Sequence, residues 1–150
     1  MTEPTLYLLD TNIISDMMRN PQGRANLQLE VRIAQSKSPL RVCTSVVVDC
    51  EVRYGLRRKS SSKLDQAYTN LLQIVEVLPL DALVTPHYAS LRARLEQAGK
   101  SIGANDSLIA ANDSLIAAHA LALGATLITA DAEFSRVPDL ALENWLVETT

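Results

Sequence analysis

Leu6-Tyr7-Leu8-Leu9-Asp10-Thr11-Asn12-Ile13-Ile14 carries two structural signals within nine residues. Its first four residues form an apolar run of the length of a buried strand, and the run ends abruptly at Asp10. Apolar residues then recur at helical spacing, through Ile13, Ile14, Met17 and Met18. An aspartate directly before such a segment is a preferred helix cap. The stretch therefore predicts a strand followed by a capped helix.

The same order of strand and helix recurs along the chain. Short apolar runs predict strands over Leu6–Leu9, Arg41–Thr44, Ile74–Leu78 (ended by Pro79) and Thr126–Thr129, and 140–145 is a candidate edge strand. Helical periodicity predicts helices over Gly23–Lys37, from a cap at Thr44 or Ser45 to Leu56, over Leu64–Leu72, over Tyr88–Ala98 (stopped by Gly99) and over Asn105–Leu123 (stopped by Gly124). This alternation predicts an α/β sandwich, with a mostly parallel central sheet of four to five strands and helices on both faces.

Composition limits the class of protein. The 150 residues, 47% hydrophobic and 21% charged, are typical of one soluble globular domain spanning 1–150. A net charge of −3 argues against a protein that coats nucleic acid through a domain-wide positive field. No basic leader or membrane-length apolar run is present, which indicates a cytoplasmic protein. Cys43 and Cys50 lack metal-site spacing, so we expect both to be buried and reduced.

Four acidic positions follow predicted strands or begin the helices beside them. Asp10 follows the first strand, Glu51 lies in the second turn of the helix after the second, and Asp131 follows the fourth. Asp106 or Asp113 begins the long helix. Ligands bind beyond the carboxyl ends of parallel strands, so these acids should meet at one edge. Two charges ~5 Å apart at a dielectric of ~20 repel by about 3 kcal/mol, which predicts a hard cation, Mg²⁺ or Mn²⁺, between them.

Several motifs, taken in order, also resemble a known family. They are Leu8–Asn12, Glu51–Gly55, Ile102–Asp106 with Ile109–Ala111, Ile128–Asp131 and Glu143–Trp145. Their order and spacing resemble the successive acidic motifs of PIN-domain ribonucleases, in particular the VapC and FitB-like toxins. The resemblance covers nearly the whole chain and implies a PIN-like α/β sandwich.

The resemblance implies a Mg²⁺-dependent (or Mn²⁺-dependent) endoribonuclease toxin. Its catalytic acids would be Asp10, Glu51, Asp131 and one of Asp106 and Asp113, with all but Glu51 as metal ligands. Side chains expected to hold the carboxylates or metal waters are Thr11, Asn12, Ser45 and Thr129. The side chains expected to grip RNA phosphates are Arg53, Arg57, Arg58 and Lys59. The implied partners are an RNA substrate such as tRNA or rRNA, a VapB-like antitoxin that neutralises the toxin, and a second copy of the chain.

A tandem repeat interrupts the family pattern. Residues 104–110 and 111–117 both read Ala-Asn-Asp-Ser-Leu-Ile-Ala, whereas the family has this segment once. Seven helical residues turn about 700°, so an extra copy shifts the helix face by only ~20° while lengthening it by ~10.5 Å. We favour Asp113 as the site residue, because the tract from it to Gly124 keeps the family's length. The alternatives place Asp106 in the site, or exchange the downstream elements between two chains in a domain-swapped dimer.

Two other functions remain open from the sequence. The duplication could leave a catalytically impaired PIN domain that acts as an antitoxin-binding partner or co-repressor. A phosphohydrolase with Asp10 as nucleophile is the third possibility, although Asn12 stands where that chemistry generally has a second aspartate. An RNA cleavage assay with and without Mg²⁺ separates the first two functions.

Overall fold

The computed structural model describes residues 5–102 and 111–147, with the side chains of 99–102 left out. Strands are β1 (Thr5–Leu9), β2 (Leu40–Ser45), β3 (Glu76–Leu78), β4 (Thr126–Ile128) and β5 (Leu142–Glu143). Helices are α1 (Thr11–Arg19), α2 (Arg24–Gln35), α3 (Val46–Lys59), α4 (Ser62–Leu71), α5 (Val84–Ile102) and α6 (Ala111–Leu123), and a 3-10 helix, η2, spans Ala132–Arg136. Asp106 and the first copy of the repeat fall outside the described residues.

The five strands form one sheet in the order β3-β2-β1-β4-β5. All the strand pairings are parallel, with β1 between β2 and β4. Leu8 is level with Cys43 on one side and with Leu127 on the other. The chain turns from one half of the sheet to the other at β1, so the carboxyl ends of β1 and β4 form a topological switch point. The predicted parallel sheet is confirmed.

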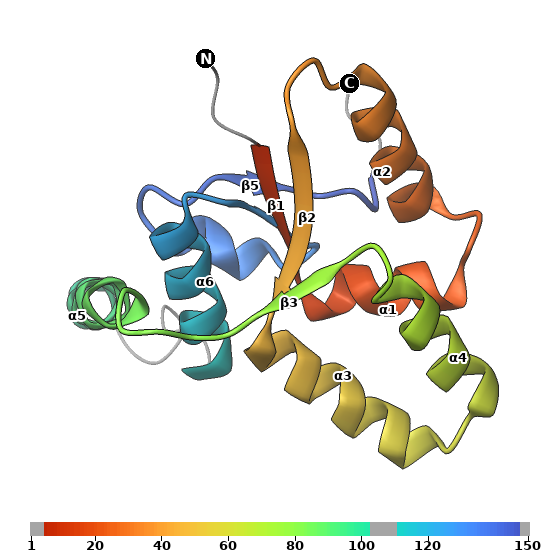
Figure 1. Cartoon of the computed structure of the whole chain (residues 1–150). Coiled ribbons are helices and arrows are strands. Elements are labelled where there is room, and N and C mark those ends of the chain that lie inside the picture. The colour runs from red at the N-terminus through yellow and green to blue at the C-terminus, as the bar shows by residue number, and fades with distance from the viewer. Residues whose placement is uncertain (1–4, 103–110, 148–150) are drawn as a thin grey trace.

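Helices cover both faces of this sheet. Figure 1 shows α5 and α6 on one side of the strands and α1, α2 and α4 on the other, with α3 below the ends of β2 and β3. The α1 helix lies against α2, α3 and α4, and α6 packs against α5. This two-sided cover explains why the strands read as continuous apolar runs instead of alternating patterns. No helix among the described residues is both long and apolar enough to cross a bilayer.

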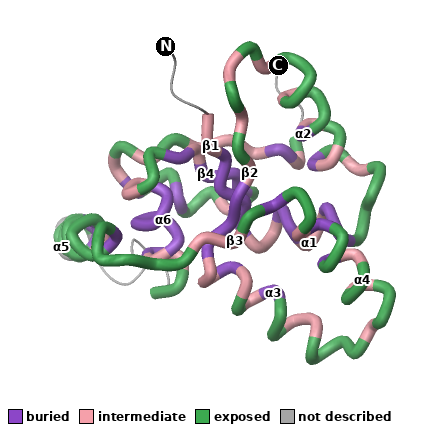
Figure 2. The backbone as a smooth tube through the Cα atoms, in the orientation of Figure 1, coloured by how far each residue is buried: buried purple, intermediate pink, exposed green. Residues whose placement is uncertain are grey.

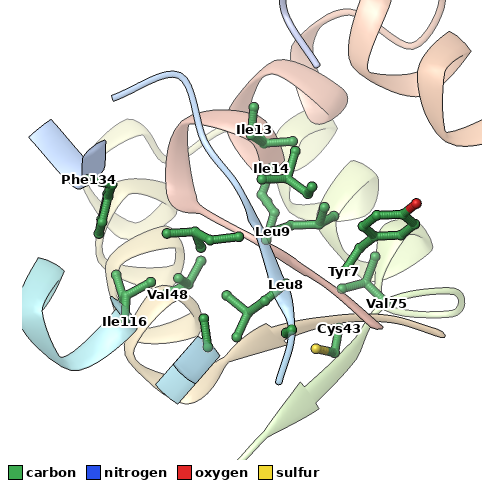
Figure 3. Close-up of a cluster of buried hydrophobic side chains, with 14 of the residues drawn as sticks. Tyr7, Leu8, Leu9, Ile13, Ile14, Cys43, Val48, Val75, Ile116 and Phe134 are labelled. Atoms are coloured by element: carbon green, nitrogen blue, oxygen red, sulfur yellow. The ribbon is translucent and has the colours of Figure 1, made fainter. Parts of the chain in front are cut away.

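The core lies along the central strands. Figure 2 shows the buried backbone concentrated in β1, β2, β4 and α6, and Figure 3 shows side chains from several elements meeting there. Leu8 and Leu9 of β1 are fully buried, as are Ile13 and Ile14 of α1 and Ile116 of α6. The helix that comes after β1 is therefore fixed by its own apolar face. Its first turn in turn holds the polar residues at the end of β1 in place.

Three local predictions are wrong. Gly99 does not end its helix, because α5 continues to Ile102. A glycine stops a helix when the chain turns left-handed there, as it does at Gly124, whose φ is +65°. Cys43 is buried but Cys50 is exposed on α3. The third strand begins at Glu76 instead of Ile74, because the residues before it form the turn that ends α4.

Candidate active site at the carboxyl ends of the central strands

Asp10 is the most deeply held of the acids. It caps α1, accepting a hydrogen bond from the Thr11 backbone N–H (2.8 Å), and only 4% of its surface is exposed. The Thr129 hydroxyl donates to its Oδ2 at 2.7 Å. Burial, reinforced by the charge of Asp131, raises the pKa of Asp10, while the hydrogen bonds from Thr129, Thr11 and Asn12 oppose that rise. The carboxylate is thus fixed in position at an electrostatic cost.

Asn12 and Thr129 join the end of β1 to the end of β4. The Asn12 amide nitrogen lies 3.3 Å from both Asp10 Oδ2 and Thr129 Oγ1, and its amide oxygen accepts the Ala130 N–H at 2.9 Å. Thr129 Oγ1 also accepts the Asp131 N–H at 3.0 Å. The bonds across the two strand ends link residues 117 to 119 positions apart and set the position of Asp10 relative to Asp131.

Glu51 reaches the same region from α3. Thr11 Oγ1 donates to Glu51 Oε1 at 2.9 Å, which ties the second turn of α3 to the first turn of α1. Ser45 caps α3 by accepting the Val47 N–H at 3.1 Å, and this cap sets where the helix begins. Glu51 therefore lies on the α1 side of α3.

Asp131 stands at the exit of β4 as the cap of η2, accepting the Glu133 N–H at 3.0 Å through Oδ1. The cap does not engage the second carboxylate oxygen, Oδ2, which is left for other contacts. Glu133 was not predicted as part of the site. It lies two residues after Asp131, and this position just beyond a predicted strand end was the signal that could have placed it near the other acids.

Asp113 lies in the first turn of α6, where the charges of the other acids act on it. Burial is the largest cause that raises its pKa from 3.8 to about 6, and the charges of Asp10, Asp131, Glu51 and Glu133 raise it further, in that order. An aspartate that responds to four other carboxylates lies among them. Asp113 is therefore within electrostatic reach of Asp10, Glu51 and Asp131, and we call these four residues the carboxylate cluster.

The two copies of the repeat are identical, but the residues after each copy differ. After the second copy, α6 continues into Ala118, His119 and Ala120, all buried. A slide of seven residues that brought the first copy into the site would place Asn112 at the position of His119 and Asp113 at that of Ala120. A buried aspartate in the apolar core is costly. This cost favours the register in which the second copy, with Asp113, lies at the site.

The hydrogen bonds of Ser45, among the described residues, run to the start of α3 and to His119 and not to a carboxylate of the cluster. The Ser45 hydroxyl lies 2.9 Å from His119 Nδ1, and both residues are buried. His119 also makes a hydrogen bond to the backbone of Pro79, and burial lowers its pKa below 6.5. The pair joins α6 to the ends of β2 and β3.

Two of the four predicted phosphate-gripping side chains are engaged with the protein itself. Arg53 pairs with Asp49 at 2.9 Å and lies over the Tyr68 ring, and Arg58 lies over the Tyr54 ring. Arg57 lines a cavity of about 490 Å³ between α3 and α4, together with Arg53. All four basic side chains, Arg53, Arg57, Arg58 and Lys59, are exposed on the second half of α3.

The cluster fits a hard divalent cation by donor type. Its ligating atoms are carboxylate oxygens, which Mg²⁺ and Mn²⁺ prefer. A bound cation would also relieve the repulsion that, together with the larger effect of burial, raises the pKa of Asp113. Within the described residues, however, no three His, Cys, Asp or Glu side chains stand close enough together to hold one ion. Mutual repulsion favours this spacing among unpaired carboxylates.

The comparisons with known proteins agree with the fold. Residues 7–140 match the model of the PIN domain family. The ribonuclease VapC2 of Rickettsia felis is 36% identical over 143 residues, which cover 93% of this chain and 98% of that protein. The tRNA(fMet)-specific endonuclease VapC of Shigella flexneri is 28% identical, covering 93% of this chain and 97% of that protein.

A solved structure gives the same result. The crystal structure of VapBC2 from Rickettsia felis bound to a promoter DNA fragment contains a chain that superposes with a TM-score of 0.76 and 33% identity, covering 94% of this chain and 99% of that one. The chain therefore belongs to the PIN domain family, and within that family to the VapC proteins. The resemblance seen in the sequence is confirmed.

Proposed function

We propose that the protein is a Mg²⁺- or Mn²⁺-dependent endoribonuclease toxin that hydrolyses RNA phosphodiester bonds in the cytoplasm and is neutralised by a cognate antitoxin. The carrying observation is the convergence of carboxylates at one end of the sheet: hydrogen bonds join Asp10 and Asp131 through Thr129, and Glu51 to Thr11. Asp113 of α6 lies within reach of these charges, since burial first and then the charges of these three acids and Glu133 raise its pKa. A concentration of negative charge destabilises a fold unless a positively charged ligand offsets it. The switch point of a parallel sheet is where ligands bind. The VapC relatives named as ribonucleases support RNA as the substrate.

The chain's own residues hold this charge in place. Asp10 is fixed by three hydrogen bonds, from Thr11, Asn12 and Thr129, and Glu51 is fixed by the Thr11 hydroxyl. Asp131 is oriented through its own N–H and through the cap of η2.

Asp10, Asp113 and Asp131 would hold the cation once its charge offsets the repulsion that keeps them apart, and Glu51 would support them. A bound divalent ion supplies positive charge that offsets the scissile phosphate and makes a nearby water more acidic. Positioning of the RNA on either side falls to the exposed basic residues of α3, Arg57 and Lys59 foremost, because Arg53 is paired with Asp49. Contacts of this kind orient a nucleic acid without reading its sequence.

A VapB-like antitoxin as partner is supported by the solved VapBC2 complex, whose matching chain covers 94% of this one. A homodimer, domain-swapped or not, stays a prediction. Sedimentation of the purified chain tests that prediction directly.

Cleavage of purified tRNA and rRNA tests the proposal. The wild type should cleave in Mg²⁺, and Asp131→Asn should reduce the rate by roughly a hundredfold or more, because it removes a cluster carboxylate while keeping side-chain size. Glu30→Gln, at an exposed position of α2, also removes one negative charge while keeping side-chain size, and as the control it should cleave as the wild type does. A folded wild type that binds a VapB-like antitoxin but cleaves no RNA would favour the impaired, partner-only alternative.

A further inference from the structure

A hollow other than the cavity between α3 and α4 adjoins the carboxylate cluster at Asp131. It has a volume of about 240 Å³ and lies where β4 and β5 end and η2 begins. Asp131 belongs both to its wall and to the cluster, so whatever fills the hollow lies next to the reacting phosphate of a bound RNA. Apolar wall is supplied by Leu142 and Ala132, and polar groups by Ser135, Glu143 and Asn144.

The charges of this hollow exclude a phosphate. Glu143 is already held by Arg32 at 2.7 Å and by the Trp145 indole N–H at 3.0 Å, so that carboxylate is fixed in place and its charge is compensated. Asp131 adds a further negative charge, and no described basic residue lines the hollow. A second phosphate group would be repelled here, whereas an uncharged planar group would not.

The polar groups of the hollow are oriented for hydrogen bonding. The Ser135 hydroxyl donates to the Ala132 carbonyl at 2.7 Å, so its proton is engaged and its oxygen can act only as an acceptor toward a ligand. Asn144 accepts the Leu146 N–H through Oδ1 at 2.9 Å, which fixes the amide plane. No described residue accepts from its Nδ2, so this nitrogen is an available donor. One acceptor and one donor beside apolar side chains suit the edge and face of a nucleobase.

We propose that this hollow, formed by Asp131, Ala132, Ser135, Leu142, Glu143 and Asn144, receives one unpaired RNA base next to the cleaved phosphodiester and sets the nucleotide preference of cleavage. The proposal rests on the proposed ribonuclease function and names the specificity subsite of that same site. Leu142 and Ala132 contact the face of the base, and Ser135 and Asn144 read its edge.

Cleavage of a pool of short single-stranded RNAs, randomised at the two nucleotides flanking one scissile position and sequenced after reaction, tests the subsite. The wild type should prefer particular bases at one flanking position. Ala132→Leu, which fills the hollow, should lower the ratio of preferred to disfavoured cleavage by about tenfold. Asn144→Asp keeps the oxygen that caps Leu146 but removes the Nδ2 donor, and should change the ratio by about fivefold, the value of one hydrogen bond. Ala82→Leu, an exposed residue beyond β3 at the opposite edge of the sheet, should leave both rate and ratio unchanged.

The outcomes separate this proposal from the function on which it rests. A wild type that cuts no RNA defeats the ribonuclease function itself. A wild type that cuts without preference at either flanking nucleotide overturns the subsite alone. So does a folded Ala132→Leu protein whose overall rate falls while its base preference stays that of the wild type.

Discussion

Replacing Asp113 with asparagine should stabilise the metal-free protein at neutral pH. The pKa of Asp113 is raised from 3.8 to about 6, a change of about two pH units, which corresponds to about 3 kcal/mol if the group were fully shielded. The side chain is partly exposed, and solvent screening reduces this to roughly 1.5 kcal/mol. Loss of a negative charge from a helix N-terminus costs about 0.3–1 kcal/mol. The expected net gain is therefore about 1 kcal/mol, or about 2–4 °C in melting temperature.

The pH dependence of this gain identifies its cause. A carboxyl whose pKa is raised on folding binds more protons in the folded state, so its contribution to stability is fully present below 3.8 and is lost as pH rises through about 6. Asp113→Asn should therefore melt above the wild type at pH 7 to 8 in EDTA, and the difference should disappear toward pH 4. Asp65→Asn makes the same change in the first turn of α4, away from the cluster, and should melt at or slightly below the wild type throughout. A gain that is independent of pH, or equal in both variants, would refute the argument that the buried and repelled charge of Asp113 destabilises the fold.

The remaining predictions concern the parts of the fold that support the site. Burial lowers the pKa of His119, so the contribution of this residue to stability is present above pH 6.5 and is lost as the pH falls. In melts from pH 8 to 5 the wild type should lose stability relative to His119→Gln, and parallel curves would contradict this. Arg32 joins α2 to β5 through its ion pair with Glu143, and both side chains are less than a third exposed. A double-mutant cycle with Arg32→Ala and Glu143→Gln should give a coupling free energy of about 1 kcal/mol. Additive effects would show that the pair is not stabilising. Gly124→Ala should destabilise the fold by about 1 kcal/mol because φ at this position is +65°. Gly55→Ala, within α3 and with open space around its Cβ position, should stabilise the fold by about 0.5–1 kcal/mol. Effects of the same sign for both variants in denaturant unfolding would contradict the backbone argument.

The strands and most helix starts could be predicted because they depend on local signals. The apolar run before Asp10 and the helical spacing after it are enough to place β1 and α1, and serine caps α3 as expected. Gly99 shows the limit of such signals. A glycine stops a helix only if the chain beyond it turns away, and that turn depends on the tertiary contacts of the next segment.

The membership of the carboxylate cluster could be predicted from topology, since the acids lie at the ends of strands that are side by side. Its internal geometry could not. Which Asp10 oxygen meets Thr129, and the link from Thr11 to Glu51, depend on rotamers fixed by packing. Asp106 lies outside the described residues, so the preference for Asp113 stays a prediction. The sequence supports it through the length of the tract to Gly124, and the structure adds the burial of His119 and Ala120 downstream.

The most direct test of the proposed ribonuclease is the cleavage rate of tRNA as a function of free Mg²⁺ and Mn²⁺, measured on protein first stripped with EDTA. The metal-free protein should be folded and inactive, and cleavage should rise with either ion to a plateau that Asp10→Asn and Asp113→Asn fail to reach. Cleavage that persists undiminished in EDTA, or that Asp10→Asn leaves intact, would contradict the assignment of the carboxylate cluster as a metal-dependent active site.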